Sequence, residues 1–84
     1  MTLTIYSKPD CHLCDDMKSL VRRVAAEQKG IAVQEIDIST DAGLLERYGL
    51  EIPVLMVDGR KVAKYRIGEQ ELRRAIRTLP SLEP

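Results

Sequence analysis

The feature that most constrains the fold is a strand-like segment that leads directly into an amphipathic helix near the N-terminus. Residues 2–6, TLTIY, are β-branched, apolar or aromatic, which is typical of a strand, and the polar residues 7–10 end it. Asp10 is then expected to cap a helix, and Gly30 to end it in the left-handed conformation. Apolar side chains recur at helical spacing between these two positions, at Leu13, Met17, Leu20, Val21 and Val24.

The next segments continue the alternation of strand and helix. Residues 31–38, IAVQEIDI, indicate a second strand. The polar residues 39–41 are expected to cap a short helix that ends at Gly49. Because one helix separates the first two strands, we expect those strands to be parallel and joined by a right-handed crossover.

The last third of the chain predicts an antiparallel hairpin. Residues 53–57 are a continuous apolar run, the Asp-Gly pair at 58–59 is a strong turn signal, and residues 61–67 return as a half-exposed edge strand. Counting back from the turn places Val54 opposite Ala63 and Pro53 opposite Lys64.

A final helix is expected to begin near Gly68 and to end before Pro80, and the tail at 80–84 is expected to be frayed. Its apolar residues share one face, at Leu72, Ala75, Ile76 and Leu79. The predicted order is therefore β-α-β-α-β-β-α. This is an α/β fold with a four-stranded mixed sheet, in which the strands are arranged second, first, third, fourth.

Composition limits the classes of function. Eighty-four residues with 44% hydrophobic content predict one domain that spans residues 1–84. Thirteen basic residues balance thirteen acidic ones, so no net charge attracts nucleic acid or an anionic membrane. The N-terminus has no apolar run long enough for a signal peptide, and no segment approaches transmembrane length, so we expect a cytoplasmic protein.

The chain has two cysteines, Cys11 and Cys14, which are three residues apart at the start of the first predicted helix. A persistent structural disulfide is unusual in the cytoplasm, so the pair favours a redox dithiol or a metal site over two cysteines that merely pack. At a helix N-terminus, unpaired amides and the helix dipole stabilise a thiolate and can lower a cysteine pKa from about 8.5 to about 3.5–7.5. Cys14 belongs to the buried stripe, so Cys11 is the expected nucleophile and Cys14 the resolving thiol.

Four features carry a resemblance to a known family. The segments YSKPDCHLC and EIPVLMVDG, the order of the elements and the terminal helix resemble the glutaredoxin branch of the thioredoxin superfamily. The sequence CHLCDDM is most similar to a group of short bacterial glutaredoxin-like proteins. The resemblance implies the thioredoxin/glutaredoxin fold and a thiol–disulfide oxidoreductase.

The resemblance also implies roles for individual residues. Cys11 matches the attacking cysteine and Cys14 the resolving one, while Lys8 matches the basic residue that holds a glutathione carboxylate. Ile52 matches the residue whose backbone pairs with the cysteine of the substrate, and Pro53 matches a cis proline that faces the dithiol.

Two places depart from the family pattern. His12 and Leu13 stand where glutaredoxins usually have proline and tyrosine, and Ala63 and Lys64 stand where they have a Gly-Gly pair. We therefore expect weakened binding of glutathione. Either Lys64 or Arg66 could replace the lost contacts with a contact to an anion, or both are solvated charges on an edge strand.

His12 also has two interpretations. As an imidazolium it would favour the Cys11 thiolate in a pH-dependent way, whereas adjacent helical residues do not face each other and a solvent-facing side chain is the simpler interpretation.

The expected partners follow from thiol–disulfide chemistry. The substrate is a disulfide-containing or glutathionylated protein. Electrons come from glutathione, as a co-substrate, or from a reductase of the thioredoxin-reductase type, and we expect a monomer without a tightly bound cofactor. The alternatives are a carrier of an iron–sulfur cluster or metal ion with Cys11 as a ligand, and a redox-inactive interaction module. A zinc site within one chain is disfavoured, because structural zinc takes four ligands and this chain offers two cysteines and one histidine.

Overall fold

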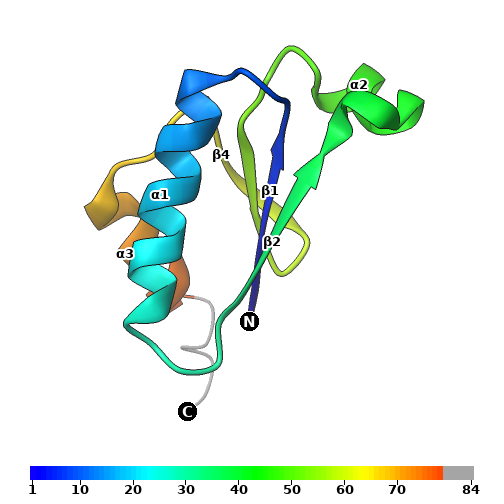
Figure 1. The fold of residues 1–84 in the computed structure, drawn as a ribbon. Helices are drawn as coiled ribbons and strands as arrows, with labels where there is room; N and C mark the ends of the chain where they lie inside the picture. The colour runs from blue at the N-terminus through cyan, green and yellow to red at the C-terminus, as the bar shows by residue number, and fades with distance from the viewer. Residues whose placement is uncertain (79–84) are drawn as a thin grey trace.

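The computed structural model describes residues 1–78 of the chain (Figure 1). Its elements in chain order are β1 (Thr2–Ser7), α1 (His12–Ala26), β2 (Ala32–Asp37), the 3₁₀ turn η1 (Ile38–Thr40), α2 (Ala42–Tyr48), β3 (Val54–Val57), β4 (Arg60–Lys64) and α3 (Glu69–Thr78). The predicted order of strands and helices is confirmed. The expectations for Leu79, for the stop at Pro80 and for the tail at 80–84 lie outside the described residues.

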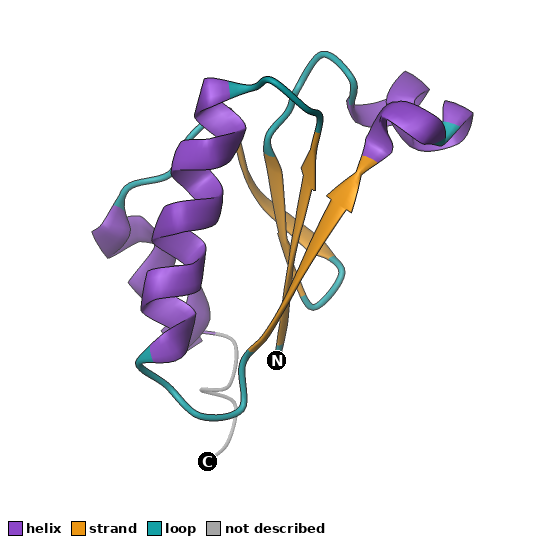
Figure 2. Cartoon of the chain, viewed as in Figure 1, coloured by secondary structure: helices purple, strands orange, loops and turns teal. Residues whose placement is uncertain are grey.

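The four strands form one mixed sheet in the predicted order β2-β1-β3-β4. Strand β1 is parallel to β2 and antiparallel to β3, and β3 is antiparallel to β4. Helices α1 and α3 lie together on one side of this sheet, while α2 lies at the far end of β2 (Figures 1 and 2). No helix within residues 1–78 is both long and apolar enough to cross a membrane.

The main core lies between the sheet and the helix pair α1 and α3. Successive side chains of a strand point to opposite faces, and in β1 the buried residues alternate with half-buried ones. Leu3 pairs with Val57 and Ile5 with Leu55, and all four are fully buried. They pack with buried residues of the two helices, namely Met17, Val21, Val24, Leu72 and Ile76.

A second, smaller core occupies the opposite face of the sheet, next to α2. The rings of Tyr6 and Tyr48 are stacked with centroids 4.7 Å apart, and Ile38 and Val54 are fully buried in the same cluster. This stack fixes α2 against the end of β1 and the start of β3, and so it positions the loop between α2 and β3.

Two predicted element ends are wrong by more than one residue. Helix α1 ends at Ala26, and Gly30 has the expected positive φ of +82° but lies in the turn that follows the helix. Strand β4 ends at Lys64 and not at residue 67, because Tyr65 adopts a φ of +70°, which breaks the extended conformation.

The predicted register of the hairpin is also wrong by one residue. Val54 pairs with Lys64, and Leu55 pairs with Ala63, because a β-bulge interrupts the ladder between Leu55 and Met56. A bulge opposes two residues of one strand to one residue of the other. Here it allows two adjacent side chains, Val62 and Ala63, to pack against the same core, which strict alternation would prevent.

Candidate functional site

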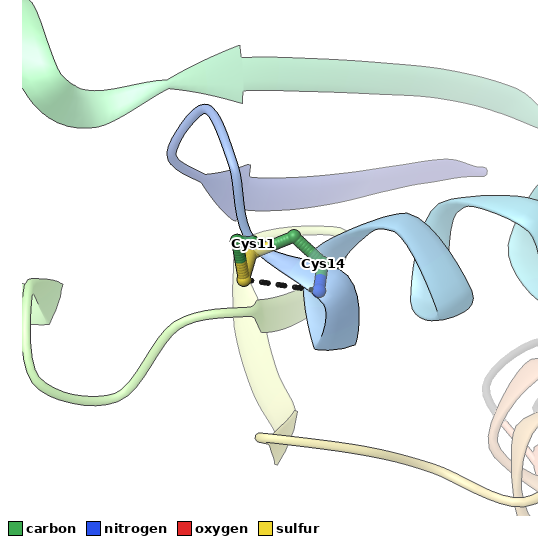
Figure 3. The surroundings of a disulfide bond; sticks show 2 residues. All are labelled: Cys11 and Cys14. Carbon is green, nitrogen blue, oxygen red and sulfur yellow. Dashed lines mark hydrogen bonds between the residues drawn. A yellow bond between two sulfur atoms is a disulfide. The ribbon is translucent and has the colours of Figure 1, made fainter.

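Cys11 and Cys14 form a disulfide, with their Cα atoms 5.1 Å apart, where the loop after β1 enters α1 (Figure 3). Cys14 is fully buried in the first turn of the helix, whereas Cys11 is half-buried. The difference in exposure that the apolar pattern predicted is therefore present. An incoming thiol or disulfide meets the sulfur of Cys11 more easily than that of Cys14.

Cys11 is the N-cap of α1, and the prediction that Asp10 occupies this position is wrong. The backbone of Cys11 is extended, and its Sγ accepts a hydrogen bond from the amide of Cys14 at 3.1 Å. Asp10 has a φ of +58° and turns the chain so that the next residue, not its own carboxylate, faces the open amides. In the reduced protein the same position would favour a thiolate at Cys11, since the amide and the helix dipole both stabilise negative charge.

The Ile52–Pro53 peptide bond is cis, as the resemblance implied, and Pro53 is buried. Tyr6 pairs with Val54, so Pro53 lies at the same end of the sheet as Ser7, the last residue of β1. The loop from Ser7 leads directly to the disulfide, and Figure 3 draws the chain that enters β3 next to the two cysteines. The dithiol and the proline therefore share one end of the sheet.

The two residues between the cysteines have different surroundings. His12 is exposed at the start of α1, as its solvent-facing interpretation requires. Leu13 is half-buried and lines a surface cavity of about 170 Å³ next to α1. The other residues that line this cavity are Asp16, Met17, Arg66 and Ile67. Arg66 thus lines the same cavity as Leu13, next to α1.

Tyr65 is a residue of the site that the sequence analysis did not include among the substrate-binding residues. Its amide donates a hydrogen bond to the carbonyl of Pro53 at 2.8 Å, and its hydroxyl donates to the carbonyl of Leu50 at 3.2 Å. The amino group of Lys64 lies 5.5 Å from the centre of the tyrosine ring, within the range of a cation–π contact. Counting from the Asp58-Gly59 turn places Tyr65 near Ile52, but nothing in the local sequence signals a tyrosine at positive φ, so its hydrogen bonds could not be predicted.

The remaining predicted residues are less closely grouped. Lys8 is half-buried in the loop between β1 and α1, three residues before Cys11, and Lys64 is exposed at the end of β4. No group of three or more histidine, cysteine or acidic side chains that could hold a metal ion occurs within residues 1–78.

One ion pair, between Lys61 and Glu51, balances a negative charge in the loop between α2 and β3. Lys61 donates a hydrogen bond to the carboxylate of Glu51, and this bond lowers the pKa of Glu51 below its ordinary value. The carboxylate next to Leu50 is therefore ionised at neutral pH but matched by an ammonium group.

A model of the glutaredoxin-like domain family (DUF836) matches residues 2–77. The chain belongs to this family. Two curated proteins are similar to this family member over most of its length. A glutaredoxin-like protein of Dictyostelium discoideum is 25% identical over 77 residues, which is 86% of this chain and 71% of that protein. A probable thioredoxin of Archaeoglobus fulgidus is 29% identical over 80 residues, which is 92% of this chain and 87% of that protein.

Solved structures support the same fold for this glutaredoxin-like chain. A structural genomics target protein from X. campestris has a TM-score of 0.72 and 33% identity, and the match covers 93% of this chain and 99% of that one. A mutant thioredoxin from Halobacterium salinarum has a TM-score of 0.71 and 27% identity, over 99% and 77% of the two chains. Glutaredoxin from E. coli matches with a TM-score of 0.63 over the whole of both chains, but at 18% identity this likeness concerns the fold alone.

Proposed function

We propose that this protein is a thiol–disulfide oxidoreductase that uses the pair Cys11 and Cys14. The observation that carries the proposal is the placement of the two sulfurs: they are bonded to each other, one half-buried at a helix N-cap and the other fully buried behind it. A nucleophile needs access and a stabilised thiolate, whereas a resolving thiol needs only to reach its neighbour.

The proposed reaction has two balanced steps. The Cys11 thiolate attacks one sulfur of a substrate disulfide, which forms a mixed disulfide and releases the other substrate sulfur as a thiolate. Cys14 then loses its proton and attacks Sγ of Cys11, which closes the Cys11–Cys14 bond and releases the reduced substrate. Two electrons pass from the protein dithiol to the substrate.

The substrate-binding residues carried over from the family are part of the same proposal. We propose that the backbone of Ile52 and the ring of Pro53 receive the substrate next to Cys11, with Lys8 available for a carboxylate. Glutathione is the proposed weak co-substrate, and a reductase of the thioredoxin-reductase type is the alternative electron donor. No tightly bound cofactor takes part.

The test is a single turnover that needs no electron donor. The protein is reduced with dithiothreitol, freed of it by gel filtration and mixed with a disulfide-bonded protein such as insulin. One equivalent of substrate disulfide should be reduced as the Cys11–Cys14 bond forms, which mass spectrometry after alkylation would detect. A protein that stays fully reduced with every disulfide tried would refute the proposal.

A further inference from the structure

Two large apolar side chains are exposed beside the proposed substrate site. Leu50, in the loop between α2 and β3, is 92% exposed, and Tyr65, which follows β4, is 43% exposed. The two are neighbours, because the hydroxyl of Tyr65 bonds to the carbonyl of Leu50. Single exposed apolar residues are ordinary, but an adjacent pair next to a reactive centre is a candidate contact surface.

Tyr65 is held in place by more than one contact, although its backbone conformation is unfavourable for a tyrosine. Its φ of +70° lies in the region that normally selects glycine. Hydrogen bonds from its amide to Pro53 and from its hydroxyl to Leu50 join it to both ends of the segment that presents the proline. Such over-determined conformations concentrate at functional sites. The ring is therefore a fixed part of the surface.

The charge of this surface is positive. The amino group of Lys64 lies over the Tyr65 ring, and within residues 1–78 neither Lys64 nor Arg66 forms a salt bridge. The nearest carboxylate in the sequence to Leu50 is that of Glu51, and Lys61 neutralises it. Glu51 also attracts Lys64, but more weakly than it attracts Lys61, to which it is hydrogen-bonded. An acidic group that approached Tyr65 would thus meet an ammonium group that forms no salt bridge within residues 1–78.

We propose that Leu50, Tyr65 and Lys64 form a docking surface for protein substrates. The occupant is a segment of a disulfide-bearing protein that carries an apolar side chain and an acidic side chain close to its cysteine. The apolar side chain would cover Leu50 and the exposed part of the Tyr65 ring, and the acidic one would pair with Lys64. This inference rests on the proposed function, because it describes the substrate of the same dithiol.

The surface favours a protein over glutathione for a physical reason. Covering an exposed leucine releases water from apolar area, and only a partner with an apolar side chain can do so. Glutathione is built from glutamate, cysteine and glycine and has no such side chain. It would leave Leu50 in water.

The test uses three synthetic peptides, each closed by one intramolecular disulfide. Beside one cysteine they carry Leu-Glu, Leu-Lys or Ser-Ser. Chromatography measures the rate at which the dithiothreitol-reduced protein reduces each peptide. This rate is divided by the rate for hydroxyethyl disulfide, which serves as an internal reference. We expect this ratio to be about tenfold higher for the Leu-Glu peptide than for the Ser-Ser peptide, the effect of burying part of one leucine. The Leu-Lys peptide should lie between them.

Three variants locate the effect. Leu50→Ser should lower the ratio for the Leu-Glu peptide to nearly that of the Ser-Ser peptide, and Lys64→Glu should reverse the preference between the Leu-Glu and Leu-Lys peptides. Lys29→Glu makes the same change of charge in the turn between α1 and β2, at the opposite end of the molecule, and should alter none of the ratios. Thermal unfolding of each variant verifies that it is folded.

The outcomes separate this inference from the proposed function. Equal ratios for all three peptides, or ratios that Leu50→Ser and Lys64→Glu do not change, would overturn the docking surface while the oxidoreductase stands. Faster reduction of glutathione disulfide than of the Leu-Glu peptide would also overturn it. If the protein reduced neither the peptides nor hydroxyethyl disulfide, the proposed function itself would fail and this inference with it.

Discussion

The amide of Tyr65 donates a hydrogen bond to the carbonyl of Pro53, 2.8 Å away, so Tyr65 and not Lys64 is the residue that bonds across to the proline. Lys64 instead pairs with Val54, one position further along β3. A substrate that lay along the Pro53 backbone would therefore meet the side chain of Tyr65 where a glycine would leave the backbone open.

Glutathione should reduce the Cys11–Cys14 disulfide slowly, because two of the contacts that a typical glutaredoxin offers are absent at Leu13 and at the Ala63-Lys64 pair. Each lost contact costs about 1 kcal/mol, so affinity should fall by roughly tenfold or more. Tyr65→Gly should raise the rate, since glycine suits a φ of +70° and exposes the backbone. Stopped-flow reduction by glutathione, with Lys64→Gly for comparison, measures both effects.

Rapid turnover with glutathione by the parent protein, unaltered by Tyr65→Gly and Lys64→Gly, would show that these positions do not control access. A parallel measurement with thioredoxin reductase and NADPH would then identify the better electron donor.

The two cysteines should behave differently when each is replaced. Cys11→Ser should abolish exchange with any disulfide, whereas Cys14→Ser should accumulate a stable mixed disulfide, because no second thiol can release the substrate. Non-reducing gels and mass spectrometry detect the adduct, and partner capture from a lysate would identify the physiological substrate. The roles would have to be exchanged if limiting iodoacetamide alkylated Cys14 of the reduced protein before Cys11.

Two of the three strand pairs could be predicted because the signals for them are local. Apolar periodicity defines the strands, one crossover helix makes β1 and β2 parallel neighbours, and the Asp58-Gly59 turn pairs β3 with β4. The pairing of β1 with β3 is not a local signal, and the family resemblance implies it. The paired cysteines, their difference in exposure and the cis bond at Pro53 were also predicted, the last from the family resemblance alone.

The predictions of the α1 N-cap and of the hairpin register were wrong because each depends on the choice between two adjacent residues. Asp10 and Cys11 are adjacent and both can cap a helix, and only the positive φ of Asp10 decides in favour of Cys11. The predicted pairing of β3 with β4 is wrong because of a β-bulge. The core accommodates this bulge because the adjacent residues Val62 and Ala63 are both apolar and both pack against it. Because Val62 and Ala63 are both apolar, the sequence does not show which of them takes the core-facing position opposite Leu55, and periodicity cannot detect the one-residue shift.

Gly49, which follows α2 and precedes Leu50, should not tolerate a side chain. A Cβ atom there would clash with the backbone carbonyl of Leu45, the group that accepts a hydrogen bond from the Gly49 amide. Gly49→Ala should lower the free energy of unfolding by about 1–3 kcal/mol, a typical cost of overpacking. Gly43→Ala is the matched control within α2: it has room for a Cβ and should stabilise by about 0.5–1 kcal/mol. Urea unfolding measures both, and equal effects would contradict the steric argument.

An ion pair between Arg22 of α1 and Glu35 of β2 makes stability depend on pH. The Arg22 guanidinium donates two hydrogen bonds to the Glu35 carboxylate, and these bonds lower the pKa of Glu35 more than its partial burial raises it. Because the pKa in the folded state lies below that in the unfolded state, the unfolded chain binds the proton more tightly. The stabilisation is present above the unfolded pKa and is lost as pH falls through the folded one.

Glu35→Gln should therefore lower the melting temperature at pH 7 and have a smaller effect in acid, below the ordinary glutamate pKa of about 4.3. The difference between parent and variant should shrink steadily as the pH falls through and below that value, because the parent alone loses an ionised partner for Arg22. Glu46→Gln is the control, since Glu46 is exposed on α2 and forms no ion pair within residues 1–78. Calorimetry at a series of pH values at low ionic strength gives the comparison. A difference between parent and Glu35→Gln that stayed constant down to pH about 3 would mean that packing, and not the charge, explains the effect of the substitution.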